Sequence, residues 1–159
     1  MLTGSLALTF YTTPRMTRDI DLVVEISAKD IERVVQGFEL QFYIDQNAVI
    51  QAVQDEGMFN LLHNEFHVKV DLIIRKADKF RQTEFQRRKS FSLMGTKVWV
   101  VSPEDLILSK LYWAKESRSE MQIRDICSLL KSVKDLDIIY MKKWLDQLGV
   151  RSLFDEITL

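Results

Sequence analysis

The sequence predicts an α+β fold, in which a mixed β-sheet flanked by helices is followed by a C-terminal region made of helices only. Short runs of alternating apolar and polar residues, typical of strands, recur up to residue 101 with helical segments between them. From Ser102 onward the apolar residues recur at helical spacing instead. We therefore expect residues 1–101 to form a sheet-based core and residues 102–159 to form a helical region packed on it.

Local patterns place the individual elements. Ser27 and Ser102 each precede a helical pattern and predict helix N-caps, while Met94-Gly95-Thr96 predicts a hairpin turn. The expected strands cover residues 18–26, 57–63, 66–74, 91–94 and 97–101. The expected helices cover residues 4–11, 28–37, 78–89, 103–116, 119–133 and 138–148, with a helix or irregular segment at 45–54 and a short terminal helix.

Composition narrows the class of protein. The 159 residues are 47% hydrophobic and 28% charged, which is ordinary for a soluble globular chain. A formal net charge of −1 provides no global basic field for a nucleic acid. The single cysteine, Cys127, rules out an intramolecular disulfide and fits a reducing compartment. No apolar stretch is long enough to cross a membrane and no leader is visible, so we expect a cytoplasmic protein.

The run TRDIDLVV, residues 17–24, predicts a buried strand that nevertheless carries two carboxylates. Side chains two residues apart on a strand point to the same face, so Asp19 and Asp21 share one face, about 7 Å apart at their Cβ atoms. The apolar side chains Ile20, Leu22 and Val24 line the other face. The two carboxylates are therefore placed to converge on water or on a cation.

The strand expected at residues 66–74 repeats this pattern. Its apolar face carries Phe66, Val68, Val70, Leu72 and Ile74, while Asp71 lies on the polar face. If the two strands are neighbours, three carboxylates meet on one face of the sheet. Like charges 4 Å apart repel by about 4 kcal/mol at an effective dielectric near 20, so such a group recruits a cation or raises its own pKa values. An all-oxygen ligand set favours Mg²⁺ or Mn²⁺, and two such ions suit phosphoryl or nucleotidyl transfer.

A plainer interpretation stands beside this one. Solvent-facing strand positions often carry charge, and Lys69 lies on the same face as Asp71, where it would serve as a partner for that carboxylate. His63 and His67 lack cysteine partners, so a zinc site is not expected. The basic residues between Arg81 and Lys89 predict a solvated helix face, or alternatively a surface that guides phosphates.

Gly4-Ser5 begins a predicted helix upstream of the carboxylates. Glycine permits close approach of the backbone, a serine hydroxyl can bond a phosphate, and a helix N-terminus favours anions. With these residues the chain resembles the nucleotidyltransferase superfamily related to DNA polymerase β, whose signature is a Gly-Ser or Gly-Gly pair, a helix, a strand with Asp-x-Asp and a third Asp on a later strand. The matching residues are Gly4-Ser5, Asp19-Ile20-Asp21 and Asp71.

Within that superfamily the chain looks most like the AbiE-type toxin nucleotidyltransferases and their minimal relatives. Two segments carry this closer resemblance: PRMTRDIDLVV, residues 14–24, and a later helix with a lysine followed by an arginine-aspartate pair. In the second segment the matching residues are Lys110, Arg118, Arg124 and Asp125. The resemblance spans residues 4 to about 130 and implies a nucleotidyltransferase-type mixed sheet flanked by helices.

The resemblance implies a role for each matching residue. Gly4 and Ser5 would contact the nucleotide phosphates. Asp19 and Asp21 would hold Mg²⁺ or Mn²⁺, and Asp71 would complete the metal site and help deprotonate the acceptor.

The resemblance also places four further residues in or beside that site. Arg15 and Arg18 lie close enough in the chain to neutralise phosphate charge. Lys110 would bind triphosphate or order the carboxylates, although a solvated lysine beside the apolar stripe of its helix is the commonest outcome. Asp125 matches the family pattern, and a helix-bracing ion pair with Arg124 or Arg118 explains it equally well.

The implied activity is transfer of a nucleoside monophosphate from an NTP such as ATP to an acceptor hydroxyl. The acceptor is open between tRNA, a protein and a small molecule, and the resemblance also implies a place in a toxin–antitoxin pair with an antitoxin partner. Family members usually carry an additional helix before the glycine pair, which here begins at residue 4. That difference would favour a homodimer or a poorly held nucleotide, so the alternative is a catalytically inactive binding or regulatory module.

Overall fold

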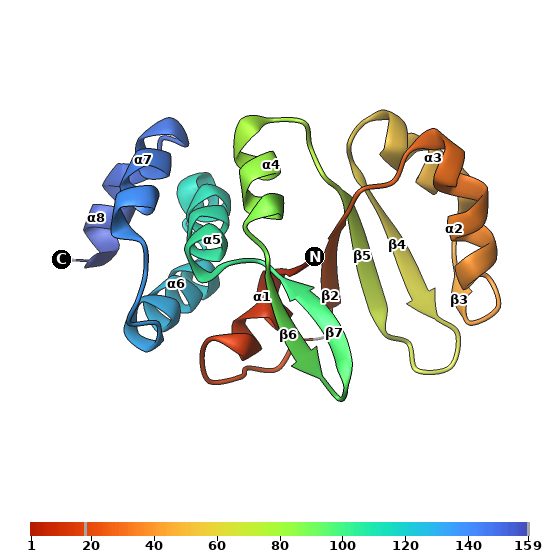
Figure 1. The fold of residues 1–159 in the computed structure, drawn as a ribbon, viewed down its shortest axis with the longest axis horizontal. Coiled ribbons are helices and arrows are strands. Elements are labelled where there is room, and N and C mark those ends of the chain that lie inside the picture. Colours follow the sequence, from red (N-terminus) through yellow and green to blue (C-terminus); the bar gives the residue numbers. More distant parts are fainter. Residues whose placement is uncertain (18, 159) are drawn as a thin grey trace.

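One seven-stranded mixed sheet organises residues 1–17 and 19–158, which are the residues described by the computed structural model. The strand order is β3-β4-β5-β2-β1-β7-β6, so β2 is the central strand (Figure 1). The strands are β1 (Leu2–Thr3), β2 (Asp19–Val24), β3 (Phe42–Tyr43), β4 (Met58–His63), β5 (Lys69–Ile74), β6 (Lys89–Leu93) and β7 (Thr96–Val100).

Helices lie toward both ends of the sheet. In Figure 1, α2 and α3 lie beside β4, whereas α5 to α8 gather at the opposite end of the molecule. The helices are α1 (Gly4–Ala7), α2 (Ile31–Phe38), α3 (Gln46–Gln54), α4 (Lys79–Gln86), α5 (Pro103–Ser117), α6 (Glu120–Ser132), α7 (Ile138–Gln147) and α8 (Arg151–Thr158), with 3₁₀ turns at Leu8–Phe10 and Ala28–Asp30. The mixed sheet and its helices confirm the predicted fold class.

The predicted helix caps and hairpin turn are confirmed. Ser27 and Asp30 form a reciprocal capping box, and the Ser102 hydroxyl accepts a hydrogen bond from the Asp105 N–H at 3.2 Å. Met94 and Gly95 both have positive φ, 49° and 79°, as a two-residue type I′ turn requires. These short-range features follow directly from local residue chemistry.

Two parts of the strand prediction need correction. The two-residue strands β1 and β3 were not expected, because a pair of residues is too short to show a period of two. Phe66 does not belong to the apolar face of β5, which begins at Lys69; its side chain is 67% exposed in the preceding turn. Val68 also precedes β5 and is only partly buried, whereas Val70, Leu72 and Ile74 lie in the core.

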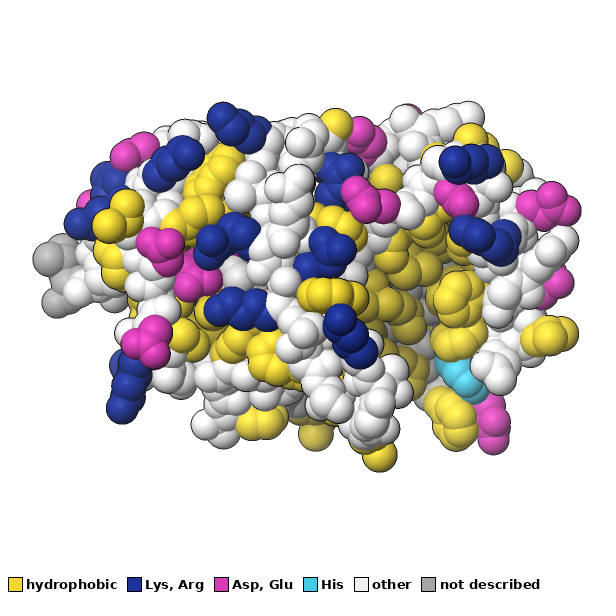
Figure 2. Space-filling view, in the orientation of Figure 1, with side chains coloured by type: hydrophobic (Ala, Val, Ile, Leu, Met, Phe, Trp, Pro, Cys, Tyr) yellow, Lys and Arg dark blue, Asp and Glu magenta, His cyan; other side chains and the backbone are white. Residues whose placement is uncertain are grey.

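The core consists of two clusters of buried apolar side chains. The smaller cluster joins α3 to β4 and β5, and the larger joins β1, β7 and α1 to the C-terminal helices. Ile20 and Leu22 of the central strand pack against both clusters. In Figure 2, hydrophobic side chains line a recess over β4 and β5.

The basic run between Arg81 and Lys89 is not simply a solvated face. Arg81 donates to the buried Glu84 at 2.9 Å and to Ser109 at 2.7 Å. Arg87 reaches the buried carboxylates of Asp105 and Glu104, at 3.1 and 3.3 Å. The run therefore fastens α4 to α5, which sequence periodicity does not reveal because the acids lie about 20 residues away.

Among the described residues, no helix combines the length and the apolar character needed to cross a membrane.

Candidate active site

Four neighbouring strands each contribute one polar residue to a single row across the sheet. Asn60 of β4 is the register partner of Asp71, Asp71 is the partner of Asp21, and Asp21 is the partner of Thr3 on β1. Register partners project to the same face, so these four side chains line up on one side of the sheet. Asp19, two residues before Asp21, shares that face and is the partner of Lys69. The structure thus brings all three predicted carboxylates together.

The charge of Asp21 is disfavoured in this row. Burial raises the pKa of Asp21, and the negative charges of Asp71 and Asp19 raise it further. The positive charges of Lys110 and Lys69 act in the opposite direction without cancelling the shift. A cation bound beside Asp21 would relieve this cost.

Gly4 lies directly against Asp21. It follows Thr3 at the junction of β1 and α1 and has a φ of +63°, in the left-handed region that favours glycine. A Cβ atom built on Gly4 would lie only 1.9 Å from Oδ2 of Asp21. The first turn of α1 therefore meets the carboxylates only because residue 4 has no side chain.

Asp71 is already satisfied by two neighbours. The Lys69 ammonium forms an ion pair with one carboxylate oxygen at 2.9 Å, and the Asn60 amide donates to the other at 2.6 Å. Consistent with this, the part of the chain that the structure describes holds no ready-made group of three His, Cys, Asp or Glu side chains able to bind a metal ion. The three carboxylates are oxygen donors of the kind that suits a hard cation, and one of them, Asp71, is paired with Lys69 in this structure.

A second polar cluster lies around Asp125 on α6. The Arg15 guanidinium forms a forked pair with both oxygens of Asp125, each at 3.0 Å, and also donates to the Ser5 hydroxyl at 2.5 Å. The buried Lys110 ammonium donates to Asp125 at 2.8 Å and to Gln122 at 2.9 Å. This cluster connects the Gly4-Ser5 turn to α5 and α6.

The electrostatics of this second cluster favour an ionised carboxylate. Burial tends to raise the pKa of Asp125, but the hydrogen bonds from Arg15 and Lys110 outweigh it and leave the pKa below its usual value. Burial lowers the pKa of Lys110, and the pairing with Asp125 offsets only part of that shift. Lys110 and Asp21 also shift the pKa of each other, so the two clusters are electrostatically linked.

The structure corrects the expectations for Lys110 and Asp125. Lys110 is 4% exposed rather than solvated, and Asp125 pairs with Arg15 and Lys110 rather than with its helix neighbours. Arg118 and Arg124 pair instead with Glu156 and Glu120. Arg18 lies outside the described residues.

Sequence reasoning missed two polar residues. Asn60 was detectable only as a polar residue at an exposed position of alternating β4, and Gln122 gives no separate signal in its helix.

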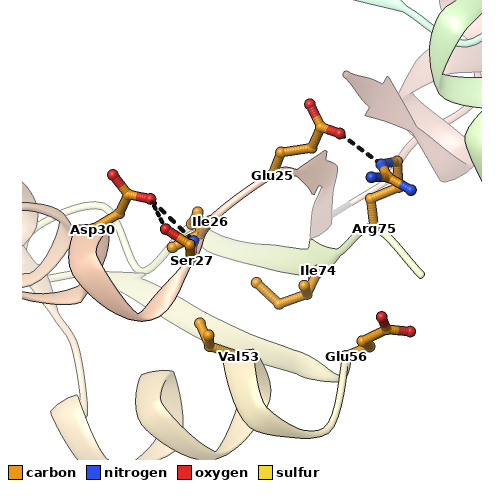
Figure 3. A pocket seen from close by; sticks show the side chains of 8 residues that line it. All are labelled: Glu25, Ile26, Ser27, Asp30, Val53, Glu56, Ile74 and Arg75. Atoms are coloured by element: carbon orange, nitrogen blue, oxygen red, sulfur yellow. Dashed lines mark hydrogen bonds and ion pairs between the residues drawn. The ribbon is translucent and has the colours of Figure 1, made fainter. Parts of the chain in front are cut away.

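A separate cleft of about 370 Å³ lies at the other end of β2 and β5, beyond Val24 and Ile74 (Figure 3). Its acids are engaged within the chain: Glu25 pairs with Arg75 at 2.7 Å, and Asp30 accepts from Ser27. The acids of this cleft are thus accounted for by contacts within the chain, and it lacks the run of three carboxylates on one sheet face.

Residues 1–155 match the family described as "Nucleotidyl transferase AbiEii toxin, Type IV TA system". The chain belongs to this family. The match covers nearly all of this AbiEii-family chain, including the carboxylate row and the cluster around Asp125. No curated protein matches the sequence.

Two solved structures share the fold of this AbiEii-family chain. The lincosamide antibiotic adenylyltransferase LnuA, bound to lincomycin, has a TM-score of 0.54 at 17% identity, over 83% of this chain and 85% of LnuA. An antigenic nucleotidyltransferase-like protein from Paracoccidioides brasiliensis has a TM-score of 0.55 at 19% identity, over 99% of this chain and 83% of that protein. At these identities the similarity establishes a nucleotidyltransferase fold.

Proposed function

We propose that this chain transfers a nucleoside monophosphate from an NTP to an acceptor hydroxyl, with Mg²⁺ or Mn²⁺ held by Asp19, Asp21 and Asp71. The observation that carries the proposal is the direct register pairing of Asp21 with Asp71, with the Gly4 backbone against Asp21. Three carboxylates and a glycine turn on one face suit an anionic substrate only when a cation accompanies it. ATP is the simplest NTP to test first.

The chain's own residues support an in-line displacement. A bond would form between the acceptor oxygen and the α-phosphorus as the bond to the pyrophosphate leaving group breaks. Asp71 would help accept the hydroxyl proton. The bound divalent cation would supply neutralisation of phosphate charge and activation of the attacking oxygen. Gly4 and Ser5 would face the phosphates from the turn, and Lys110 would either bind triphosphate or keep the carboxylates ordered.

The acceptor class is open between tRNA, a protein and a small molecule. The similarity to LnuA, which its description calls a lincosamide antibiotic adenylyltransferase, supports including small hydroxylated molecules. The AbiEii family description supports action as the toxin of a toxin–antitoxin pair, with an antitoxin as partner. A homodimer and a cytoplasmic location remain predictions from the sequence.

The test is metal-dependent NTP binding followed by transfer. We expect each productive NTP to raise the melting temperature only with Mg²⁺ or Mn²⁺, and labelled NMP to appear on an acceptor from RNA, protein or small-molecule pools. Asp21→Asn should reduce transfer by at least about a hundredfold, as loss of a group that stabilises the transition state does. Asp135→Asn, at an exposed position between α6 and α7, is the matched control and should transfer normally.

The second candidate is a non-catalytic binding module. The contacts of Asp71 with Lys69 and Asn60 favour this candidate, because both oxygens of that carboxylate already have partners within the chain. This candidate predicts no metal-dependent nucleotide shift and the same behaviour for Asp21→Asn and wild type. Such a result would refute the nucleotidyltransferase proposal.

A further inference from the structure

The ammonium group of Lys69 occupies the place where a cation would balance the carboxylate row. Lys69 is the register partner of Asp19 on β2 and lies two residues before Asp71 on β5. Its Nζ atom is 2.9 Å from Oδ2 of Asp71, whose carboxylate is only 9% exposed. A single lysine thus reaches from an accessible strand position to the most buried acid of the row.

The Lys69 ammonium lies among the three acids. It pairs directly with Asp71, and Lys69 is the register partner of Asp19, which shares its face of β2 with Asp21. The side chain is 39% exposed, so the ammonium can leave the row for solvent without a change in the sheet. By contrast, Lys110 is buried and held by Asp125.

We propose that Lys69 is a tethered competitor of the divalent cation: its ammonium binds Asp71 in the metal-free protein and must be displaced before the carboxylates hold a metal. This inference rests on the proposed function, because it requires the carboxylate row to be the metal site. Asn60 has a different role in the same exchange. Its neutral amide holds the other oxygen of Asp71 at 2.6 Å and keeps the carboxylate oriented in both states.

Competition has a consequence that a purely structural ion pair lacks. Removing the ammonium eliminates both the rival cation and its repulsion of the incoming metal, so metal affinity rises. If the Lys69 ammonium neither competed with the metal nor repelled it, its removal would lower the melting temperature and leave metal affinity unchanged. Metal affinity is therefore the deciding measurement, and it is independent of catalysis.

The experiment is calorimetric titration of the whole chain with Mn²⁺ alone. Lys69→Met should bind Mn²⁺ about tenfold more tightly than wild type, as expected when one like charge leaves contact distance of a partly exposed site. Lys69→Arg keeps the charge and should bind no more tightly than wild type. Lys131→Met, an exposed position on α6, is the matched control and should leave the affinity unchanged.

The outcomes separate this inference from the proposed function. Equal Mn²⁺ affinity in Lys69→Met and wild type, with binding lost in Asp21→Asn, would leave the metal site standing and overturn the role of Lys69. Mn²⁺ binding in neither wild type nor Lys69→Met would overturn both. Lys69→Gln provides a second neutral variant if the methionine protein fails to fold, as judged by circular dichroism.

Discussion

The ionised form of Asp21 is destabilised by the negative charges of its two neighbours on the same face. Its position in the central strand fixes it opposite Asp71, and strand alternation places Asp19 on the same side. Burial is the largest cause of the raised pKa of Asp21, the charges of Asp71 and Asp19 add to it, and the neighbouring lysines only partly offset the shift. A residue that weakens the fold in this way is typical of a functional site.

Asp21→Asn is expected to stabilise the metal-free protein at neutral pH. A carboxyl whose pKa is raised on folding stabilises the folded state below the unfolded pKa, and that contribution is lost as pH rises through the folded pKa. Asp21→Asn cannot lose this contribution to stability. Its unfolding free energy should therefore equal that of wild type at low pH and exceed it increasingly as pH rises. We expect about 1 kcal/mol at pH 7, the lower end of the repulsion between unit charges 4 Å apart.

Denaturant unfolding with a chelator present, from pH 3.5 to 7.5, measures this difference. Asp135→Asn, the exposed control, should show no pH-dependent gain. A variant as stable as wild type throughout the range would mean that the three carboxylates do not repel one another appreciably.

At the level of elements, the junction of β1 and α1 decides how closely the chain approaches the carboxylates. Two hydrogen bonds tie Met1 to Val23 on β2, which places the turn after β1 beside Asp21. Gly4 begins α1 with positive φ, at the position where any side chain would collide with the Asp21 carboxylate. The site therefore depends on a backbone conformation as well as on acids.

Gly4→Ala should damage both the fold and the site. The new Cβ would overlap Asp21, and alanine at positive φ costs about 1 kcal/mol in addition. We expect a loss of about 2 kcal/mol or more in unfolding free energy, together with weaker Mn²⁺ binding. Gly95→Ala measures the cost of alanine at positive φ without a collision, because its added Cβ meets no atom within 4 Å.

Chemical denaturation and Mn²⁺ titration of the two alanine variants separate these effects. Gly95→Ala should lose stability and keep its metal affinity. If Gly4→Ala behaves the same way, the close approach at Asp21 has no part in metal binding.

The sequence predicted elements wherever local chemistry determines them. The strand around Asp21 and the caps at Ser27 and Ser102 have strong short-range signals, and the predicted carboxylates do share one face. The pairing of Asp125 with Arg15 joins residues 110 positions apart, so no periodicity could reveal it. For the same reason the burial of Lys110 was missed: a lysine is buried only when distant partners satisfy it.

Across the whole molecule, the sheet and the C-terminal helices share one core. The larger apolar cluster contains Leu2 and Val100 of the sheet together with Leu108, Ile126 and Leu145 of the helices. The division into residues 1–101 and 102–159 remains a proposal about organisation. A shared core predicts that both parts unfold together.

Arg87 strengthens this connection by joining α4, α5 and α7. Its guanidinium contacts Asp105 and Glu104 of α5 and lies 3.7 Å from the centre of the Tyr140 ring on α7. The Tyr140 hydroxyl donates to Asp105 at 2.5 Å. One partly exposed arginine thus balances two buried acids at the boundary between the sheet-based core and the helices.

Arg87→Met should lower the unfolding free energy by about 2 kcal/mol while leaving one cooperative transition. Removing one partner of a fully buried pair costs about 3–5 kcal/mol, and we reduce that figure because the Arg87 side chain is 31% exposed. Arg124→Met breaks an exposed pair with Glu120 and should cost no more than about 0.5 kcal/mol.

Calorimetry with circular dichroism at two wavelengths checks both values. Two separate transitions in Arg87→Met would show that the helices unfold independently, and a cost equal to that of Arg124→Met would show that the buried acids do not depend on this arginine.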